Sequence, residues 1–531
     1  MLAKLSTRPA VRRCAGTGAL ALTLLGAGLP AAGRPQPDLS RFYRQKVTWT
    51  ACKGPDMPKD LQCGKVTVPL DYARPRKGTL DVALARYRAT GKKQGSVLLN
   101  FGGPGGAGVP ELATDGKEFM DLTNGYDVVT FDPRGVGRSS PVSCGEGSDE
   151  ASTALDDEAG LAHPQVLLAR LREAAGACTR HSGPVLPHIG TVNAARDLDV
   201  IRQALGDKKL NYLGFSYGTR LGAVYAAQFP HKVGRLALDG VDTLTEPLSA
   251  QGLAAAEGQQ TALDDFLDWC TTDVACPFGQ DRRAAADQVA GLVRSLDANP
   301  VPTDFGGSFS GQDLVGAIGQ GLYSRQLWPS LERALASLVQ DGDVRGVQNF
   351  ATGGAGLPLG GHRNGGLVDP QDVPADNLEA ALMAINCADD PDRPGAARIT
   401  KDLKGLQAEY EQASPVFGRY RLTELLMCYG RPKGTDFIRD RVKDVDSARM
   451  LLVGTRGDPA TPYQWTVETA ARLGPSAVVL DNKGDGHTGY TSSTCVHQKI
   501  DDFLLYGSLP PSGSSCPADG EDWSATLNPT S

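Results

Sequence analysis

The sequence of 531 residues lacks the features that would assign it to a nucleic-acid-binding, fibrous or disordered class. It has no excess of basic residues, because 54 Lys and Arg face 61 Asp and Glu and leave a formal net charge of -7 at pH 7. Phosphate binding needs clustered Lys and Arg, so this balance argues against a nucleic-acid partner. Biased composition is also absent, since 40% hydrophobic and 22% charged residues are ordinary for a soluble globular protein.

Beyond the N-terminus, no apolar run approaches the ~20 residues that a membrane-spanning helix needs. The first residues carry basic side chains up to Arg13, then an apolar run over 19–29, then small residues up to Gly33. This order is typical of a secretory signal peptide, here residues 1–33, rather than of a membrane anchor. We therefore expect a secreted, extracellular protein without stable membrane insertion. The adjacent Arg12 and Arg13 leave both Sec and twin-arginine export open.

The cysteines lack the spacing of a metal site. No CxxC pair is present and no His lies at zinc-ligand spacing beside a cysteine, so we expect no metal and no cofactor. Of the 11 cysteines, Cys14 falls within the signal segment, and an even set in an exported chain indicates disulfides. The sequence does not determine their connectivity, and we predict that sequential neighbours pair. The predicted bridges are Cys52 with Cys63, Cys144 with Cys178, Cys270 with Cys276, Cys387 with Cys428, and Cys495 with Cys516.

Short apolar runs that alternate with helical patterns predict an α/β fold with a mostly parallel central sheet. The predicted strands are 96–101, 126–131, 210–214, 235–238, 450–454 and 477–480, and the predicted helices of this part are 192–205, 217–229 and 498–505. Thr191 is the expected N-cap of the first of these helices and Gly206 its stop. Upstream, Leu80, Val82 and Leu84 alternate with other residues, which predicts a strand with one buried face.

The pattern changes between about residues 246 and 430, where amphipathic helices such as 327–338 and 380–385 are separated by Gly-rich loops. The chain is also about three times the ~150 residues of a typical domain, so an insertion is expected. We predict a helical cap domain of residues 246–430, inserted between the N-terminal part 34–245 and the C-terminal part 431–531 of one core.

The segment Gly214-Phe215-Ser216-Tyr217-Gly218 matches G-x-S-x-G and lies between a predicted strand and a predicted helix. That context predicts a nucleophile turn, because a serine hydroxyl must project sharply toward a base and the turn crowds its neighbours, which glycine relieves. An ordinary glycine-flanked strand end is the alternative. We predict that Ser216 is the nucleophile of an α/β-hydrolase.

In this architecture an acid and then a histidine follow on loops after late strands. Asp458 follows the predicted strand 450–454, and His487 follows the strand 477–480. Asp485 is a rival acid, but it shares a loop with His487 and could hardly orient the ring from behind. We therefore predict that His487 moves the proton of the nucleophile and that Asp458 orients and stabilises the imidazolium.

A tetrahedral intermediate needs preorganised donors for its negative charge. The predicted oxyanion hole consists of the backbone N–H groups of Tyr217 and Gly103, the latter in the glycine-rich loop 102–106. A phosphate cradle is the alternative for this loop, but it lacks the Gly-Lys-Ser/Thr ending of a P-loop. The turn that begins at Asp132 is expected to be structural.

These residues resemble the secreted tripeptidyl aminopeptidases of actinobacteria, which are relatives of the proline iminopeptidases. The resemblance spans roughly residues 45–520 and rests on the segments 101–106, 132–135, 214–218, 457–462 and 486–488. It implies removal of short peptides or single residues from free N-termini, with the helical insertion as a cap over the site. The sequence differs from proline iminopeptidases in having Phe101 where they have His before Gly-Gly-Pro-Gly.

An aminopeptidase must bind a buried ammonium group, which requires a carboxylate because an unpaired buried charge is costly. The resemblance assigns Asp389 to the family's acidic position, while a solvated loop acid is the alternative. Thr461 matches a family position near the triad acid, and a simple turn role is its alternative. We expect a secreted, monomeric serine exopeptidase that releases tripeptides, other short peptides or residues from peptide substrates with a free N-terminus.

Two other functions are compatible with parts of the sequence. The same triad serves acyl transfer in general, so a secreted esterase or lipase is the second hypothesis. A hydrolase fold without activity, used as a binding protein, is the third, and a complete Ser, Asp and His set argues against it.

Overall fold

A computed structural model of the chain describes residues 37–518, except 55–56, 146–162, 245, 304–306, 352–368, 391, 423–425, 433–437 and 439–440. The predicted signal segment 1–33 and the Gly-rich loops 353–356 and 360–362 lie outside the described residues. The chain divides into two compact units, Met1–Asp38 and Leu39–Ser531. All the helices and strands that the structure describes belong to the second unit.

The described strands of the core form one ten-stranded sheet in the order β1-β2-β3-β5-β4-β6-β7-β10-β11-β12. Their bounds are β1 (Thr50–Ala51), β2 (Gln62–Pro69), β3 (Thr79–Tyr87), β4 (Gly95–Asn100), β5 (Tyr126–Phe131), β6 (Leu210–Phe215), β7 (Val233–Asp239), β10 (Met450–Gly457), β11 (Ala477–Asp485) and β12 (Ser515–Cys516). The pairs from β1 to β5 along this order are antiparallel, and all pairs from β5 to β12 are parallel. The predicted α/β fold with a mostly parallel sheet is therefore confirmed.

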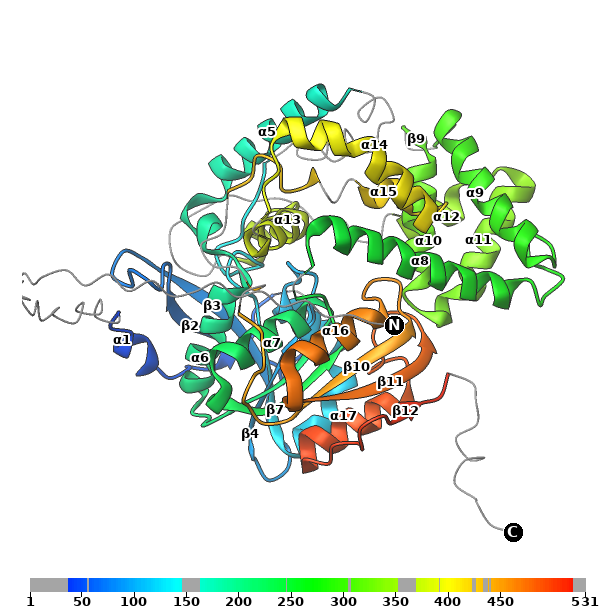
Figure 1. The fold of residues 1–531 in the computed structure, drawn as a ribbon. Coiled ribbons are helices and arrows are strands. Elements are labelled where there is room, and N and C mark those ends of the chain that lie inside the picture. The colour runs from blue at the N-terminus through cyan, green and yellow to red at the C-terminus, as the bar shows by residue number, and fades with distance from the viewer. Residues whose placement is uncertain are drawn as a thin grey trace, which may run out of the picture. The chain divides into compact units, whose positions relative to one another are not determined.

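Both faces of the parallel strands are covered, because alternate side chains of a strand point to opposite faces. On β4, Leu98 belongs to one hydrophobic cluster, whereas Val97 and Leu99 belong to another. The first cluster includes residues of α6 (Thr191–Leu205), α7 (Tyr217–Gln228) and α16 (Tyr463–Leu473), and the second includes residues of α2 (Gly108–Asp115), η1 (Gly116–Asn124) and α17 (Thr494–Tyr506). Figure 1 shows α6, α7, α16 and α17 beside the strands of the sheet.

The expectation for β3 was wrong in one respect. The alternation of Leu80, Val82 and Leu84 predicted one buried face, but Asp81, Ala83 and Ala85 on the other face are buried as well. The helix α2 contacts this strand and covers the small alanine side chains. Periodicity in the sequence identified the strand but did not reveal the second layer.

The expected N-cap of α6 was also wrong. Gly190 occupies the N-cap position, and Thr191 is the first helical residue. Its hydroxyl donates instead to Asp389 of the inserted region over 2.6 Å. The expected stop at Gly206 is confirmed, since this residue ends the helix in the left-handed conformation.

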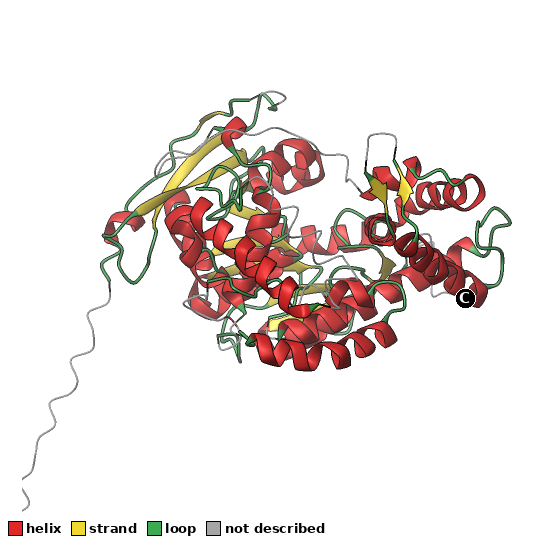
Figure 2. Cartoon of the chain, turned by 90° about the horizontal axis from the view of Figure 1, so that it is seen from above, coloured by secondary structure: helices red, strands yellow, loops and turns green. Residues whose placement is uncertain are grey.

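The inserted region contains most of the remaining helices, and they lie above the sheet in Figure 1. The elements are α8 (Leu248–Cys270), α9 (Arg282–Ala298), β8 (Val301–Pro302), β9 (Ser308–Phe309), α10 (Gly311–Leu322), η4 (Arg325–Leu327), α11 (Trp328–Asp341), α12 (Arg345–Ala351), η5 (Pro370–Asp372), α13 (Asn377–Asp389), α14 (Ala396–Ala413) and α15 (Gly418–Arg421). The short pair β8 and β9 lies apart from the main sheet (Figure 2) and was not foreseen in the sequence.

Two kinds of packing hold the insertion. Helices α8 to α12 share a hydrophobic cluster of their own, which includes the buried side chains of Phe266, Ile318 and Trp328. Helix α13 instead belongs to the main cluster of the core, through residues such as Ala381 and Ile385. One part of the insertion is therefore built around its own core, and another part is bound directly to the α/β core.

The other described elements of the core are short or peripheral: α1 (Ser40–Tyr43), α5 (Pro164–His181), η2 (Gly183–His188), η3 (Pro230–Lys232) and η8 (Gly474–Ser476). Five disulfides join Cys52 with Cys63, Cys144 with Cys178, Cys270 with Cys276, Cys387 with Cys428, and Cys495 with Cys516. These are the pairs that the sequence predicted. Within the described part of the chain, no helix is both long and apolar enough to cross a membrane.

Candidate active site

Ser216 lies between β6 and α7 in a sharp turn, with φ 54° and ψ -126°. A positive φ is strained for a residue with a side chain, and such strain is found where a turn must aim a functional group. The flanking glycines make this turn possible. A Cβ on Gly214 would lie 2.6 Å from the carbonyl oxygen of Gly218, and one on Gly218 would lie 2.6 Å from that of Asn100.

Asp458 and His487 meet on loops after β10 and β11. The imidazole Nδ1 of His487 lies 2.9 Å from Oδ1 and 3.0 Å from Oδ2 of Asp458. The rival acid Asp485 instead binds Arg325 of the inserted region over 2.6 Å. With Nδ1 directed at the carboxylate, the other ring nitrogen, Nε2, is the one left to exchange a proton with a substrate or nucleophile.

Neighbouring groups of the acid loop also bind the Asp458 carboxylate. The backbone N–H groups of Ala460 and Thr461 each donate to Oδ1 over 2.8 Å, and the Thr461 hydroxyl donates to Oδ2 over 2.8 Å. Thr461 is buried, with 3% of its surface exposed. Its side chain therefore holds the Asp458 carboxylate, as the turn role would have it, and the substrate contact of Thr461 stays a prediction.

Burial and neighbouring charges shift the pKa values of Asp458 and His487 in opposite directions. Burial raises the pKa of the Asp458 carboxyl, but the charge and hydrogen bond of His487 and the donors of the acid loop outweigh it, so the pKa lies below its usual value. Burial lowers the pKa of His487, but Asp458 and the nearby charges of Asp239 and Asp242 raise it above the usual 6.5. An ionised carboxylate next to a basic imidazole is the electrostatic state that favours proton uptake by the ring.

Asp239 joins the serine turn to the histidine loop, and no motif in the sequence pointed to it. Its carbonyl oxygen accepts the N–H of Ser216 over 3.0 Å. Its carboxylate accepts the N–H of Gly489 over 3.0 Å and that of Tyr490 over 2.8 Å. Burial is the main reason that the pKa of Asp239 rises to about 6. One residue at the end of β7 thus holds the backbone on both sides of the site.

The glycine-rich loop 102–106 lies directly against the serine turn. A Cβ on Gly102 would lie 2.6 Å from the carbonyl oxygen of Phe215, 2.9 Å from Cβ of Ser216 and 3.4 Å from the backbone nitrogen of Tyr217. Tyr217 is the first residue of α7, where the N–H groups have no partner within the helix. The loop residue Gly103 follows with φ 108°, a conformation that glycine adopts without strain.

The turn that begins at Asp132 has the structural role that the sequence predicted. The Asp132 carboxylate accepts the N–H of Val109 over 2.9 Å and that of Arg138 over 3.0 Å. Asp132 is fully buried, and burial is the first cause of the rise of its pKa to about 6. These contacts hold the start of α2, which follows the glycine loop.

Asp389 is engaged inside the protein. Its Oδ1 accepts the N–H of Thr191 over 2.8 Å, and its Oδ2 accepts the Thr191 hydroxyl over 2.6 Å. Arg220 of α7 lies 3.5 Å away, and only 5% of the surface of Asp389 is exposed. Both carboxylate oxygens therefore join α13 to the core, and the contact of Asp389 with a substrate ammonium group, which the resemblance implies, stays a prediction.

The insertion touches the glycine loop, the acid loop and the histidine loop. On α13, the carbonyl oxygen of Leu378 would lie 2.8 Å from a Cβ on Gly105 in the glycine loop. On α8, a Cβ on Gly258 would lie 2.6 Å from Pro462 in the acid loop. Between α10 and η4, the carbonyl of Tyr323 accepts the N–H of His487 over 2.8 Å. The site is thus built from core and insertion together, and no motif in the sequence pointed to these contacts.

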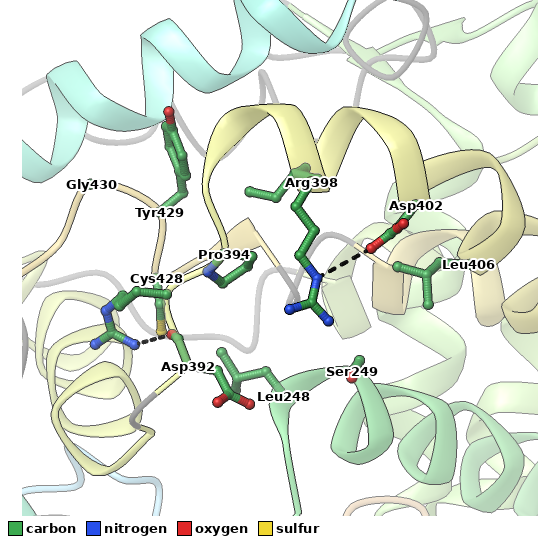
Figure 3. Close-up of a pocket in the computed structure, with 12 residues that line it drawn as sticks. Leu248, Ser249, Asp392, Pro394, Arg398, Asp402, Leu406, Cys428, Tyr429 and Gly430 are labelled. Carbon is green, nitrogen blue, oxygen red and sulfur yellow. Dashed lines mark hydrogen bonds and ion pairs between the residues drawn. The ribbon is translucent and has the colours of Figure 1, made fainter.

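A cavity of about 510 Å³ lies between α8, α14 and the segment around Cys428. Arg398 extends from α14 into it and is paired with Asp402, as Figure 3 shows. The lining includes the apolar side chains of Leu248 and Leu406 but none of the three candidate triad residues. This cavity therefore does not contain the candidate catalytic groups.

Two groups of three side chains in the described residues bring possible metal ligands within 4.8 Å of one another. In the first, Cys270 and Cys276 accompany Glu332, but their sulfur atoms form a disulfide and are not thiolates. The second consists of Asp121, His497 and Asp501, in which Nε2 of His497 lies 3.5 Å from the Asp501 carboxylate. The hydrogen bond to Asp501 is the first cause that raises the pKa of His497 above its usual value.

One protein family matches the C-terminal part of the chain, and individual proteins match nearly all of it. A family described as TAP-like protein matches residues 414–516. Serine protease Hip1 of Mycobacterium tuberculosis is 32% identical over 545 residues, which cover 97% of this chain and 99% of Hip1. Tripeptidyl aminopeptidase of Streptomyces lividans is 31% identical, with 88% of this chain and 86% of that protein covered.

A further relative bears the name of an esterase. Carboxylesterase B of Mycobacterium tuberculosis is 29% identical over 535 residues, which cover 95% of this chain and 98% of that protein. The names of these three proteins denote hydrolysis of peptides or of an ester, and a serine triad carries out both reactions by acyl transfer.

Proposed function

This chain belongs to the family of α/β-hydrolase serine peptidases that includes Hip1 and the tripeptidyl aminopeptidases, and from that premise we propose that it is a secreted exopeptidase. In this proposal it releases tripeptides or other short peptides from free N-termini, and it acts as a monomer. The observation that carries it is the contact of 2.9 Å between His487 and Asp458, with the histidine loop tied through Asp239 to the strained turn of Ser216.

The proposed reaction begins with proton transfer. Nε2 of His487 takes the hydroxyl proton of Ser216 as its oxygen attacks the peptide carbonyl, and Asp458 stabilises the resulting imidazolium. The imidazolium then gives the proton to the leaving amine, and an acyl-enzyme on Ser216 remains. Water, deprotonated by the same imidazole, attacks the acyl carbonyl, which releases the N-terminal peptide and restores the serine.

The proposed oxyanion hole consists of the N–H groups of Gly103 and Tyr217. The contact of Gly102 with the serine turn supports this assignment, since it brings the loop within reach of the carbonyl that Ser216 attacks. The start of α7 adds the positive end of a helix dipole to the same place. Such fixed donors lower the barrier because they are oriented before charge develops.

The insertion supports an exopeptidase rather than an endopeptidase. It contacts the glycine loop, the acid loop and the histidine loop. An insertion that covers these loops restricts access to the ends of peptides, whereas an endopeptidase must admit chain on both sides of the bond. The proposed cap comprises residues 246–430.

Secretion is part of the proposal. Five disulfides are typical of proteins that fold in an oxidising compartment. Residues 1–33 have the order of charges, apolar run and small residues of a signal peptide. N-terminal sequencing of the protein recovered from culture medium tests this, and an uncleaved N-terminus would contradict it.

The proposed specificity is tested with peptidyl-aminomethylcoumarin substrates whose N-termini are free or acetylated. Because recognition of an ammonium group cannot be satisfied by an acetylated amine, we expect about 100-fold or greater preference for the free form. Mass spectrometry of longer peptides then gives the length of the released piece. Equal turnover of both forms would refute the aminopeptidase assignment, and the variant Ser216→Ala serves as the inactive control.

An esterase is the second candidate, and the similarity to carboxylesterase B favours it. Its triad chemistry would be the same, with an alcohol in place of the leaving amine. Hydrolysis of p-nitrophenyl acyl esters without any cleavage of free peptides would favour this candidate over the first.

A further inference from the structure

The cap reaches the candidate catalytic histidine through the segment 323–325, which joins α10 to η4 and α11. The N–H of His487 donates to the carbonyl of Tyr323 over 2.8 Å. The Tyr323 ring lies edge to face against the imidazole, with the ring centroids 5.1 Å apart. Backbone and side chain of one cap residue therefore both touch the residue that carries the proton.

The histidine loop adopts a backbone conformation that needs support. Gly486 has φ 96° and Thr488 has φ 67°, so left-handed residues flank His487 on both sides. For a residue with a side chain this conformation costs roughly 1–3 kcal/mol, which surrounding contacts must offset. Gly486 also permits the approach of the cap, since a Cβ there would lie 2.8 Å from the carbonyl oxygen of Tyr323.

An ion pair between Arg325 and Asp485 joins the same two segments, two residues away from Tyr323 and from His487. Arg325 donates to the Asp485 carboxylate over 2.6 Å, and their side chains are 38% and 14% exposed. The guanidinium also lies over the ring of Trp328, 5.0 Å from its centroid, and Trp328 is a buried member of the cap's own cluster. The arginine is thereby anchored in the cap while its charge holds the histidine loop.

Without Arg325, the charges around Asp485 would repel one another. A Cβ on Gly457 would lie 2.5 Å from Oδ1 of Asp485 and 3.2 Å from Oδ2 of Asp265, so these carboxylates face one narrow space. Asp265 belongs to α8 of the cap. Burial and then the charge of Asp485 raise the pKa of Asp265 to about 6, so the two carboxylates repel each other when both are ionised.

We propose that the cap segment 323–325 positions His487 for catalysis, with Arg325 as a positioning residue that acts through its ion pair to Asp485. The proposal rests on the proposed role of His487 as the base that activates Ser216. It makes the cap part of the catalytic apparatus in addition to its role as a barrier to substrates. A movement of this segment would change the reaction rate even if the substrate still bound.

The test compares Arg325→Gln with Arg282→Gln. Arg282 is the matched control, because it lies in the same cap, is 37% exposed, and forms its ion pairs within the cap itself, with Asp268 over 2.6 Å and Asp264 over 3.1 Å on α8. The readouts are kcat and KM on a free-N-terminus substrate, the rate of Ser216 labelling by a fluorophosphonate, and Tm. The labelling rate depends on activation of Ser216 and is independent of which substrate class the enzyme accepts.

A displacement of a catalytic group by about 1 Å can slow a reaction ~100-fold. We therefore expect Arg325→Gln to lower kcat and the labelling rate by about 10- to 100-fold with KM nearly unchanged, and Arg325→Lys to restore part of the loss. Asp485→Asn should give a similar loss, and the double variant should be no slower than either single variant. Arg282→Gln should retain wild-type kcat and labelling.

Two results would overturn the proposal. One is a labelling rate of Arg325→Gln within twofold of wild type, or no lower than that of Arg282→Gln. The other is additive losses in the double variant, which would mean that the two residues act independently. Failure of the proposed function looks different, because an enzyme that cleaves only esters would still show the slower labelling in Arg325→Gln.

Discussion

The backbone N–H of Ser216 donates to the carbonyl of Asp239 over 3.0 Å, while the carboxylate of the same aspartate holds the backbone just after His487. Asp239, which takes no part in the proposed chemistry, thus holds the loops of the proposed nucleophile and the proposed base in fixed positions relative to one another. This relationship makes Asp239 the most informative site for testing how the two loops are held.

Replacement of Asp239 should lower both stability and turnover. In Asp239→Asn the amide oxygen can replace one acceptor, but the NH₂ group would face the N–H of Gly489. Because hydrogen bonds to a charged group contribute about 1.5–3 kcal/mol, we expect a loss of that order in the free energy of unfolding, together with slower turnover. Denaturant unfolding and kcat measure the two effects.

Asp81→Asn provides the control for Asp239. Asp81 is also a buried carboxylate on a strand, but its partners are Lys65 and Thr67, away from the catalytic loops. It should reduce stability and leave kcat at the wild-type value. If Asp239→Asn behaved in the same way, the link between the two loops would have no bearing on turnover.

The pH dependence of kcat/KM should report on His487. The pKa of His487 is raised above 6.5, so the imidazole is protonated, and unable to act as a base, up to a pH above that value. We therefore expect activity to rise with pH through a midpoint above 6.5. Stopped-assay rates between pH 5 and 9 on the preferred substrate measure the midpoint.

Asp458→Asn should move this midpoint and lower the maximum. Loss of the negative charge removes the largest contribution that raises the pKa of His487, so the midpoint should shift to lower pH. The neutral amide also no longer fixes the tautomer, and we expect kcat to fall by about 10³- to 10⁴-fold with the fold intact. A near-normal rate would transfer the acid role away from Asp458.

Gly102→Ala should lower kcat strongly, because the added methyl group displaces the backbone of the glycine loop. The residue has φ 96°, and its added methyl group would lie 2.6 Å from the carbonyl oxygen of Phe215. The glycine loop must then move away from the serine turn, which removes the Gly103 donor from the proposed oxyanion hole. Loss of one such donor typically costs ~10²- to 10³-fold in kcat. Gly316→Ala is the control, since a Cβ there meets no atom within 4 Å.

Removal of the Cys387–Cys428 bridge should destabilise the cap. The bridge spans 41 residues and joins the end of α13 to the segment after α15. A loop of this length corresponds to a stabilisation of about 2–4 kcal/mol, so the double variant Cys387→Ala with Cys428→Ala should unfold at a lower denaturant concentration. An unchanged unfolding midpoint would show that α13 is held by its packing on the core alone.

Much of the fold and part of the site could be predicted because their signals are local. A strand buried on both faces is a short apolar run, and the predicted strands 126–131 and 96–101 coincide with β5 and, within one residue, with β4. The turn at Ser216 needs a glycine on each side, so the five residues 214–218 are enough to predict it. The order of Ser216, Asp458 and His487 follows from a sheet topology in which loops after parallel strands share one edge.

What the sequence by itself determined was therefore the α/β class, the strand-turn-helix motif and the candidate residues on the loops after β10 and β11. Tertiary structure alone decided that Asp239 joins the serine turn to the histidine loop and that Thr461 binds the Asp458 carboxylate. It also decided that both carboxylate oxygens of Asp389 bind Thr191. The contacts of Tyr323 and Arg325 in the insertion with the histidine loop likewise come from the folded chain. These relationships join residues that are mostly tens to hundreds of positions apart. A hydrogen bond or ion pair across such a separation leaves no periodicity or turn signal at either end, so only the folded chain reveals it.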